Sequence, residues 1–275
     1  MNSMYSNVVL YGLWAVVPVV LAVVALRPVS ARELTRFTNR YGLELKPGTM
    51  TAVTQSVRRG RTGRLVGAAL GLSLYPVLLA FGVEIPSQSL AYGLVGYLVG
   101  AFMTSLAPTS LEDEVRHASL VPRRPSDYLP RIALVTPAVA VVVSTAALIA
   151  YLIEPRRTVA DFYGSPSGLA AAAIAAVATF VAIRIVVARP QPVTSPEMVV
   201  VDDAVRTQAI HTLAGSGIAV ALFGTGACLW AMGGAAAPGW LHITGFVAGV
   251  CALVGALYAW AFRSAPWRVE RTMLQ

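Results

Sequence analysis

The chain has 275 residues, of which 56% are hydrophobic and 12% charged, and its mean hydropathy is +0.67. Soluble domains carry about 25% charged residues, so this composition excludes a soluble globular fold and a disordered chain. Both cysteines lie inside apolar runs, which excludes a disulfide-stapled secreted domain. The formal charge of +8 is no signature of nucleic-acid binding, because the arginines cluster between the apolar runs, as in membrane proteins.

Seven apolar runs have about the length of a helix that crosses a hydrocarbon core of about 30 Å. They cover residues 8–26, 65–83, 90–107, 132–153, 169–188, 210–232 and 240–262. A cleaved signal peptide is disfavoured at the first run, because no positive charge precedes it. We therefore expect an all-α, polytopic transmembrane bundle of about seven helices, with residues 1–275 forming a single integral membrane domain.

The basic residues predict how the chain is oriented. Nine of them lie between the first two runs, and further arginines follow the third, fifth and seventh runs. Only Arg156 and Arg157 lie on the opposite face if the seven helices alternate in direction. The positive-inside rule then predicts an N-terminus outside the cell and a C-terminus in the cytoplasm, in a multi-pass protein of the plasma membrane.

The cytoplasmic segment 27–64 has room for short amphipathic helices. Ser30 and Glu33 have the spacing of a capping box, and Gly42 can end the helix that they begin. A second amphipathic stretch, 49–61, ends in a basic cluster made of Arg58, Arg59, Arg61 and Arg64. This cluster either serves only to retain the loop in the cytoplasm, or forms a face that docks anionic lipid or a protein partner.

Glycines four residues apart form three stripes that predict close helix packing. The glycines are Gly63, Gly67 and Gly71 in the second run, Gly96 and Gly100 in the third, and Gly245 and Gly249 in the seventh. Packing within one chain is the main expectation, and homodimerisation through one stripe is the alternative.

Arg184 is the charged residue placed most clearly inside an apolar run. It lies five residues before Arg189, about 7–8 Å inside the helix end, so its side chain can snorkel to the cytoplasmic interface. A buried pair with Asp202 or Asp203 is the alternative.

Asp202 and Asp203 resemble half of an aspartate-rich motif that holds Mg²⁺ and a diphosphate. A second carboxylate cluster, which such a site needs, does not occur in the sequence. We therefore expect the pair to place favourable negative charge at the N-terminus of the helix 210–232. No metal or cofactor is expected.

His242, Gly245 and Gly249 resemble a conserved run of rhomboid proteases, and residues 214–217 resemble the segment that carries their nucleophile. A serine and its histidine base must come within about 3 Å of each other. Ser216 is expected at the cytoplasmic start of its helix and His242 at the external start of the next, which leaves about 24 Å of helix rise between them. We therefore exclude this protease site and predict no catalytic residue.

Three cytoplasmic segments, 36–49, 116–131 and 201–217, resemble those of uncharacterised multi-pass membrane proteins of high-GC actinobacteria. The preference for arginine over lysine and the helices rich in Ala, Val and Gly agree with such a source. The resemblance implies a location in the plasma membrane and no particular substrate.

Together these features favour a non-enzymatic scaffold or accessory subunit with an arginine-rich cytoplasmic docking face. Its expected partners are the lipid bilayer and either anionic headgroups or a membrane protein, and not nucleic acid. The alternative is a small-molecule permease, which would use the glycine stripes, Arg184 and the kinks expected at Pro18, Pro76 and Pro137.

Overall fold

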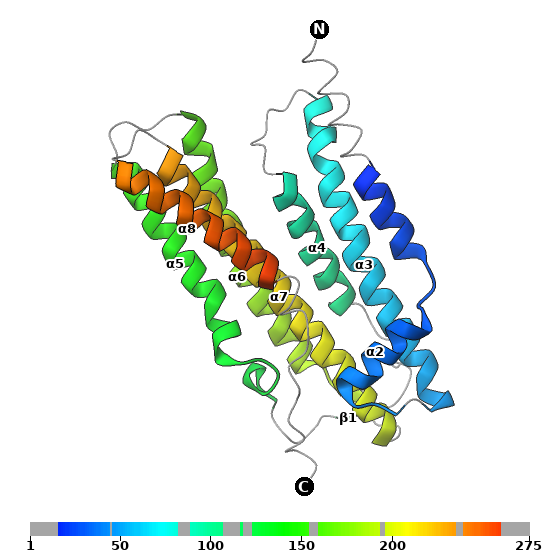
Figure 1. Ribbon diagram of the computed structural model, residues 1–275. Helices are drawn as coiled ribbons and strands as arrows, with labels where there is room; N and C mark the ends of the chain where they lie inside the picture. The colour runs from blue at the N-terminus through cyan, green and yellow to red at the C-terminus, as the bar shows by residue number, and fades with distance from the viewer. Residues whose placement is uncertain are drawn as a thin grey trace. The chain divides into compact units, whose positions relative to one another are not determined.

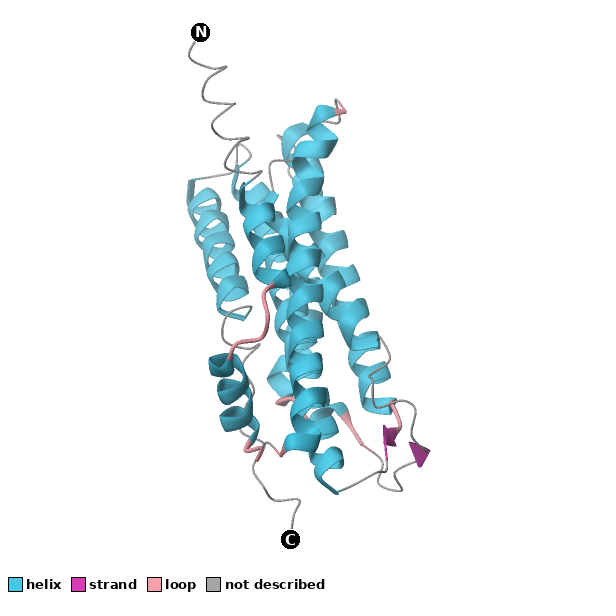
Figure 2. Ribbon diagram, turned by 90° about the vertical axis from the view of Figure 1, so that its right-hand side faces the viewer, coloured by secondary structure: helices cyan, strands magenta, loops and turns pink. Residues whose placement is uncertain are grey.

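The computed structural model describes residues 16–44, 46–81, 89–106, 116–117, 123–153, 159–192, 196–234 and 239–259. These ranges are almost entirely helical, and the predicted all-α class is confirmed (Figure 2). The exception is a pair of two-residue strands, β1 (Arg116–His117) and β2 (Gln191–Pro192), which pair antiparallel.

Three helices in the described ranges are long and apolar enough to cross a membrane, fewer than the seven predicted. They are α5 (Arg131–Ile153), the Pro166–Ala188 part of α6 (Val159–Ala188) and the Glu197–Ala231 part of α7 (Pro196–Gly234). The shorter apolar helices Val16–Leu26, Tyr92–Leu106 and Ile243–Tyr258 rise about 16–24 Å, less than a hydrocarbon core of about 30 Å. The predicted ends at residues 8–15 and 260–262 lie outside the described part of the chain.

Several helices run further than their apolar segments. The predicted amphipathic stretch 49–61 and the run 65–83 form one continuous helix, α3 (Pro47–Ala80). Likewise α6 begins ten residues before the run 169–188, and α7 begins fourteen residues before the run 210–232. Arginine, glutamine and glutamate lower hydropathy but are good helix formers, so a hydropathy boundary does not end a helix.

Contacts divide the chain into two compact units. Unit 1 comprises the described parts of Met1–Tyr128 and Arg184–Ile210, and unit 2 those of Leu129–Ile183 and His211–Ala265. In unit 1, α2 (Ala31–Tyr41) and α4 (Ser89–Leu106) lie beside α3 (Figure 1). Unit 2 contains α5, α8 (Gly239–Tyr258) and most of α6 and α7.

Unit 1 has a small apolar core outside the predicted spans. Leu34 and Phe37 of α2 pack with Val53 and Val57 of α3 and with residues of α7. The α7 residues are Val201 and Ala204. The polar halves of α3 and α7 thus form, together with α2, a folded layer, which we call the α2 layer.

In unit 2, α7 is buried on every side. All residues from 211 to 221 are buried, including Ser216 at 2% exposure. A helix that is apolar all round is typical of the centre of a bundle.

Candidate functional site

The α2 layer begins with a capped helix. The Ser30 hydroxyl accepts a hydrogen bond from the Glu33 backbone N–H at 3.3 Å, and a Glu33 carboxylate oxygen accepts from the Ser30 N–H at 2.9 Å. At the other end, Gly42 adopts a left-handed conformation with φ 62°, and its N–H donates to the Thr38 carbonyl. Glycine adopts this conformation without steric cost, which explains why α2 ends there.

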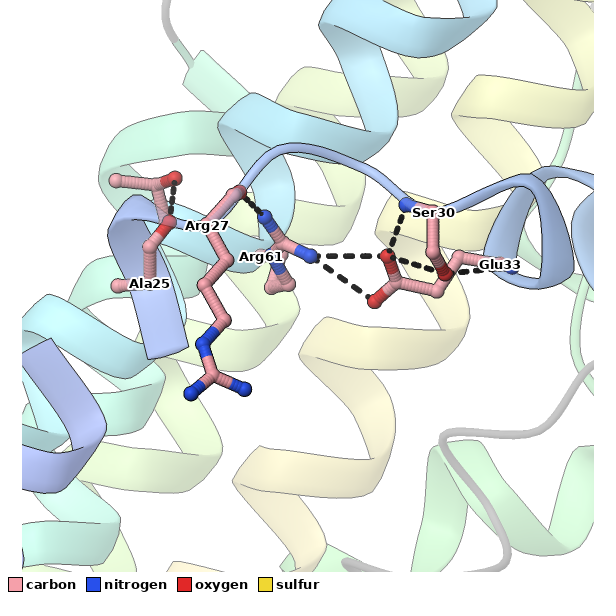
Figure 3. A network of polar contacts seen from close by, with 6 residues as sticks. Ala25, Arg27, Ser30, Glu33 and Arg61 are labelled. Carbon is pink, nitrogen blue, oxygen red and sulfur yellow. Dashed lines mark hydrogen bonds and ion pairs between the residues drawn. The ribbon is translucent and has the colours of Figure 1, made fainter. Parts of the chain in front are cut away.

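Arg61 of α3 is bonded both to α2 and to the segment that precedes α2 (Figure 3). Its guanidinium donates to both carboxylate oxygens of Glu33, at 3.0 and 2.9 Å, and also to the carbonyl of Arg27. One residue further, the Thr62 hydroxyl donates to the carbonyl of Ala25 at 2.9 Å. These bonds fix the end of helix Val16–Leu26 level with the middle of α3.

Glu33 is the titratable group at the centre of this network. Burial raises its pKa, but the hydrogen bond from Ser30 and the hydrogen bonds and charge of Arg61 outweigh burial, so the pKa is lowered from 4.5. The carboxylate is therefore ionised at neutral pH and keeps both partners.

α2 presents two different faces. Leu34, Phe37 and Thr38 are buried in the layer, whereas the remaining surface of the helix is exposed and basic. The exposed residues are Ala31, Arg32, Thr35, Arg36, Asn39 and Arg40. The three arginines follow one another at four-residue spacing, so they lie on one side of the helix.

The structure divides the basic cluster that the sequence predicts as a single docking face. Arg58 and Arg59 are exposed. Arg61 is only 13% exposed at its side chain and holds Glu33, and the Arg64 guanidinium lies 5.9 Å from the ring centre of Tyr97, in cation–π contact. Two of the four predicted arginines therefore make contacts within unit 1, Arg61 with α2 and Arg64 with α4.

A buried ion pair joins two residues of α7 in unit 1. Arg206 and Asp202, one helical turn apart on α7, pair at 2.8 Å with side chains 2% and 8% exposed. The same guanidinium donates to the carbonyls of Val186, Val187 and Arg189, at 3.1, 3.2 and 2.8 Å. It therefore supplies donors to the last carbonyls of α6, which have no partner within their own helix.

This pair changes the account of three predicted residues. Asp202 and Asp203 lie in the second turn of α7, which begins at Pro196, and not at a helix N-terminus. The ion pair of Asp202 forms with Arg206, while Arg184, considered as its partner from the sequence, has an exposed side chain. The four-residue spacing of Asp202 and Arg206 is the sequence signal for this pair.

Asp203 contacts the segment before α5. Its carboxylate accepts a hydrogen bond from the Tyr128 hydroxyl at 3.2 Å. Burial, followed by the charge of Asp203, raises the pKa of Tyr128 to about 12. Tyr128 is therefore protonated at neutral pH and acts as a hydrogen-bond donor.

The glycine stripes of α3 and α4 face each other. A Cβ added at Gly67 would lie 2.2 Å from the carbonyl oxygen of Gly96, and one at Gly100 would lie 2.1 Å from that of Gly63. One at Gly71 would lie 2.0 Å from the carbonyl oxygen of Tyr92. These stripes bring two backbones of the same chain together, so they are not open surfaces for a second copy.

In unit 2 the close approaches involve other glycines. Gly249 of α8 lies near Gly226 of α7, where an added Cβ would be 3.3 Å from a carbonyl oxygen, and Gly245 is buried. The tighter contact joins Gly168 of α6 to Gly224 of α7, at 2.5 Å. Neither Gly168 nor Gly224 belongs to a stripe predicted from the sequence.

Ser216 is a packing residue in the structure. Its hydroxyl is buried and donates to the carbonyls of Thr212 and Leu213, at 2.7 and 3.2 Å, within its own helix. The side chain of His242 lies outside the described residues. Among the residues that are described, no group of three His, Cys, Asp or Glu side chains could hold a metal ion.

Comparison of the chain with models of protein families, with curated proteins and with solved structures found no match.

Proposed function

We propose that the chain is a seven-helix integral protein of the plasma membrane, N-terminus out and C-terminus in, that serves as a non-enzymatic scaffold or accessory subunit. Its docking face is the α2 layer on the cytoplasmic side. The relationship to multi-pass actinobacterial membrane proteins belongs to the same proposal.

The proposal is based on the position of exposed arginines on a helix that is packed against the rest of unit 1. Arg32, Arg36 and Arg40 stand on a helix whose other face is buried against α3 and α7. An arginine stripe that served only as a retention signal would need no fixed geometry, because the positive-inside rule counts charges near the span ends. A rigid support favours recognition of a partner, since little entropy is lost on binding.

The permease alternative finds less support. The groove on α5 and α7, with a cavity of about 420 Å³, has apolar side chains and the hydroxyl residues Thr136 and Thr225 as its lining. The hydroxyl of Thr225 donates to the carbonyls of Ala140 and Ala221. Such a groove presents no charged group to a polar solute, and Arg184 is not among its lining residues.

Crosslinking in native membranes tests the proposal. We expect the wild-type chain to crosslink to a defined set of membrane proteins, and R58Q/R59Q or R36Q/R40Q to lose members of that set. R124Q/R131Q is the matched control, because it removes two exposed cations outside the α2 layer. A crosslinking pattern unchanged in both docking-face variants would contradict the scaffold role.

A further inference from the structure

The arginine side of α2 is an exposed and strongly basic helix face in the α2 layer. Six of the eleven residues of α2 are exposed, three of them are arginines, and none is acidic. Its one acidic residue, Glu33, is held by Arg61. Arg32, Arg36 and Arg40 have no hydrogen-bond or ion-pair partner among the described residues, and we call these three the α2 arginine face.

The packing of α2 sets the direction of this face. Leu34 and Phe37 contact the sides of α3 and α7, the helices that continue into apolar segments. The opposite side of α2 therefore points away from these helices and is exposed. Figure 1 shows α2 beside the polar part of α3.

The hydrogen bonds at Arg61 and Thr62 indicate how far the α2 arginine face lies from the hydrocarbon core of the membrane. They place the end of helix Val16–Leu26 level with these two residues. Val57 and Val53, which contact α2, lie four and eight residues from Arg61, about 6 and 12 Å beyond that level. Headgroups extend about 5–8 Å beyond the hydrocarbon core, and charges are felt over a further screening length of about 8 Å.

The chemistry of the face favours an electrostatic partner. The apolar side of α2 is covered by protein, so α2 cannot bind a membrane by inserting apolar side chains. Guanidinium groups match the geometry of phosphate oxygens and are permanently charged. We infer that the α2 arginine face binds the headgroups of anionic phospholipids beside the bundle, an inference that depends on the membrane orientation under the proposed function.

Lipid titration of the purified full-length chain tests the inference. Phosphatidylglycerol is added to the chain in detergent micelles, with phosphatidylcholine as the comparison, and bound lipids are counted by native mass spectrometry. The variants are R36Q/R40Q, the charge-preserving R36K/R40K, and R124Q/R131Q as a control of equal charge loss.

We expect the wild-type chain to prefer phosphatidylglycerol and R36Q/R40Q to bind it about tenfold more weakly, because each arginine near an anionic surface contributes a several-fold factor. R124Q/R131Q should stay close to wild type, and raised salt should weaken wild-type binding. R36K/R40K should bind more strongly than R36Q/R40Q but more weakly than wild type, because lysine keeps the charge and loses the guanidinium geometry. Equal phosphatidylglycerol affinity in R36Q/R40Q and wild type, or no effect of salt, would overturn the inference.

The result is separable from the scaffold role. If R36Q/R40Q keeps its lipid affinity but loses a crosslinked protein, the face binds an acidic protein, so the lipid inference fails and the scaffold proposal stands. If it loses lipid affinity while every crosslink in R36Q/R40Q and R58Q/R59Q is unchanged, the lipid inference stands and the scaffold role fails.

Discussion

Arg206 shows how a single buried side chain can connect two helices of this chain. Its guanidinium neutralises Asp202 and also satisfies three backbone carbonyls at the end of α6. A charge at 4% exposure is tolerated only with such partners, because an unpaired buried charge is costly.

Arg206→Met should therefore strongly destabilise the fold. The substitution leaves Asp202 buried without its cation and removes the donors to α6, so we expect a loss of about 3–5 kcal/mol in the free energy of unfolding. Thermal unfolding in detergent measures this loss, with Arg58→Met as the exposed control. An R206M chain that unfolds at the wild-type temperature would contradict the structural role of the pair.

The lowered pKa of Glu33 predicts that the stability of the α2 attachment depends on pH. Its pKa is lowered in the folded state, so its contribution is present above the unfolded value of 4.5 and is lost as the pH falls through the lowered folded value. The protection factors of the α2 amides in hydrogen exchange should therefore fall in acid, below about pH 4.5. In Glu33→Gln this pH dependence should disappear, and an equal dependence in that variant would show that another group is responsible.

At the scale of helices, the contact between α3 and α4 depends on the absence of side chains. Gly67→Ala places a methyl group against the backbone of Gly96, where neither helix can yield without shifting. We expect a loss of about 1–3 kcal/mol, as for overpacked cores. Melting temperature in detergent is a suitable measurement.

Gly60→Ala is the matched control for this packing. Gly60 lies in the same helix, but a Cβ there meets nothing within 4 Å. Alanine is a better helix former, so this variant should gain about 0.5–1 kcal/mol. If Gly67→Ala and Gly60→Ala had the same effect, close packing of α3 on α4 would be excluded.

Local sequence patterns predict the start and end of α2, whereas hydropathy does not predict the length of α3. The capping pattern of Ser30 and Glu33, and the end of α2 at Gly42, appear in the structure because each depends on neighbouring residues. Hydropathy does not predict the continuity of α3 through its arginines, because hydropathy reflects the surroundings of a segment and not its backbone conformation. The bonds of Arg61 to Glu33 and of Arg206 to α6 join residues distant in sequence, for which hydropathy and spacing give no signal.

The same long-range contacts change the predicted docking cluster. From the sequence, Arg61 and Arg64 belong to a docking cluster, and in the structure one holds Glu33 and the other faces Tyr97. The sequence alone does not identify the α2 arginine face, because that face depends on which side of α2 is buried. The exposed position of Arg184 also depends on tertiary packing.

At the scale of the whole molecule, the proposed docking role depends on the side of the membrane on which the α2 layer lies. The positive-inside rule predicts that the arginines of the α2 layer lie in the cytoplasm. Phe81, directly after the end of α3, is then expected outside the cell. Two positions report this directly: Asn39 on the exposed side of α2, and Phe81, which is 81% exposed.

Cysteine labelling in intact cells is the most direct test. In a background with Cys228→Ala and Cys251→Ser, single N39C and F81C chains are treated with a membrane-impermeant maleimide. We predict that F81C reacts in intact cells and that N39C reacts only after the membrane is permeabilised. Labelling of N39C in intact cells, with F81C protected, would contradict a cytoplasmic α2 layer.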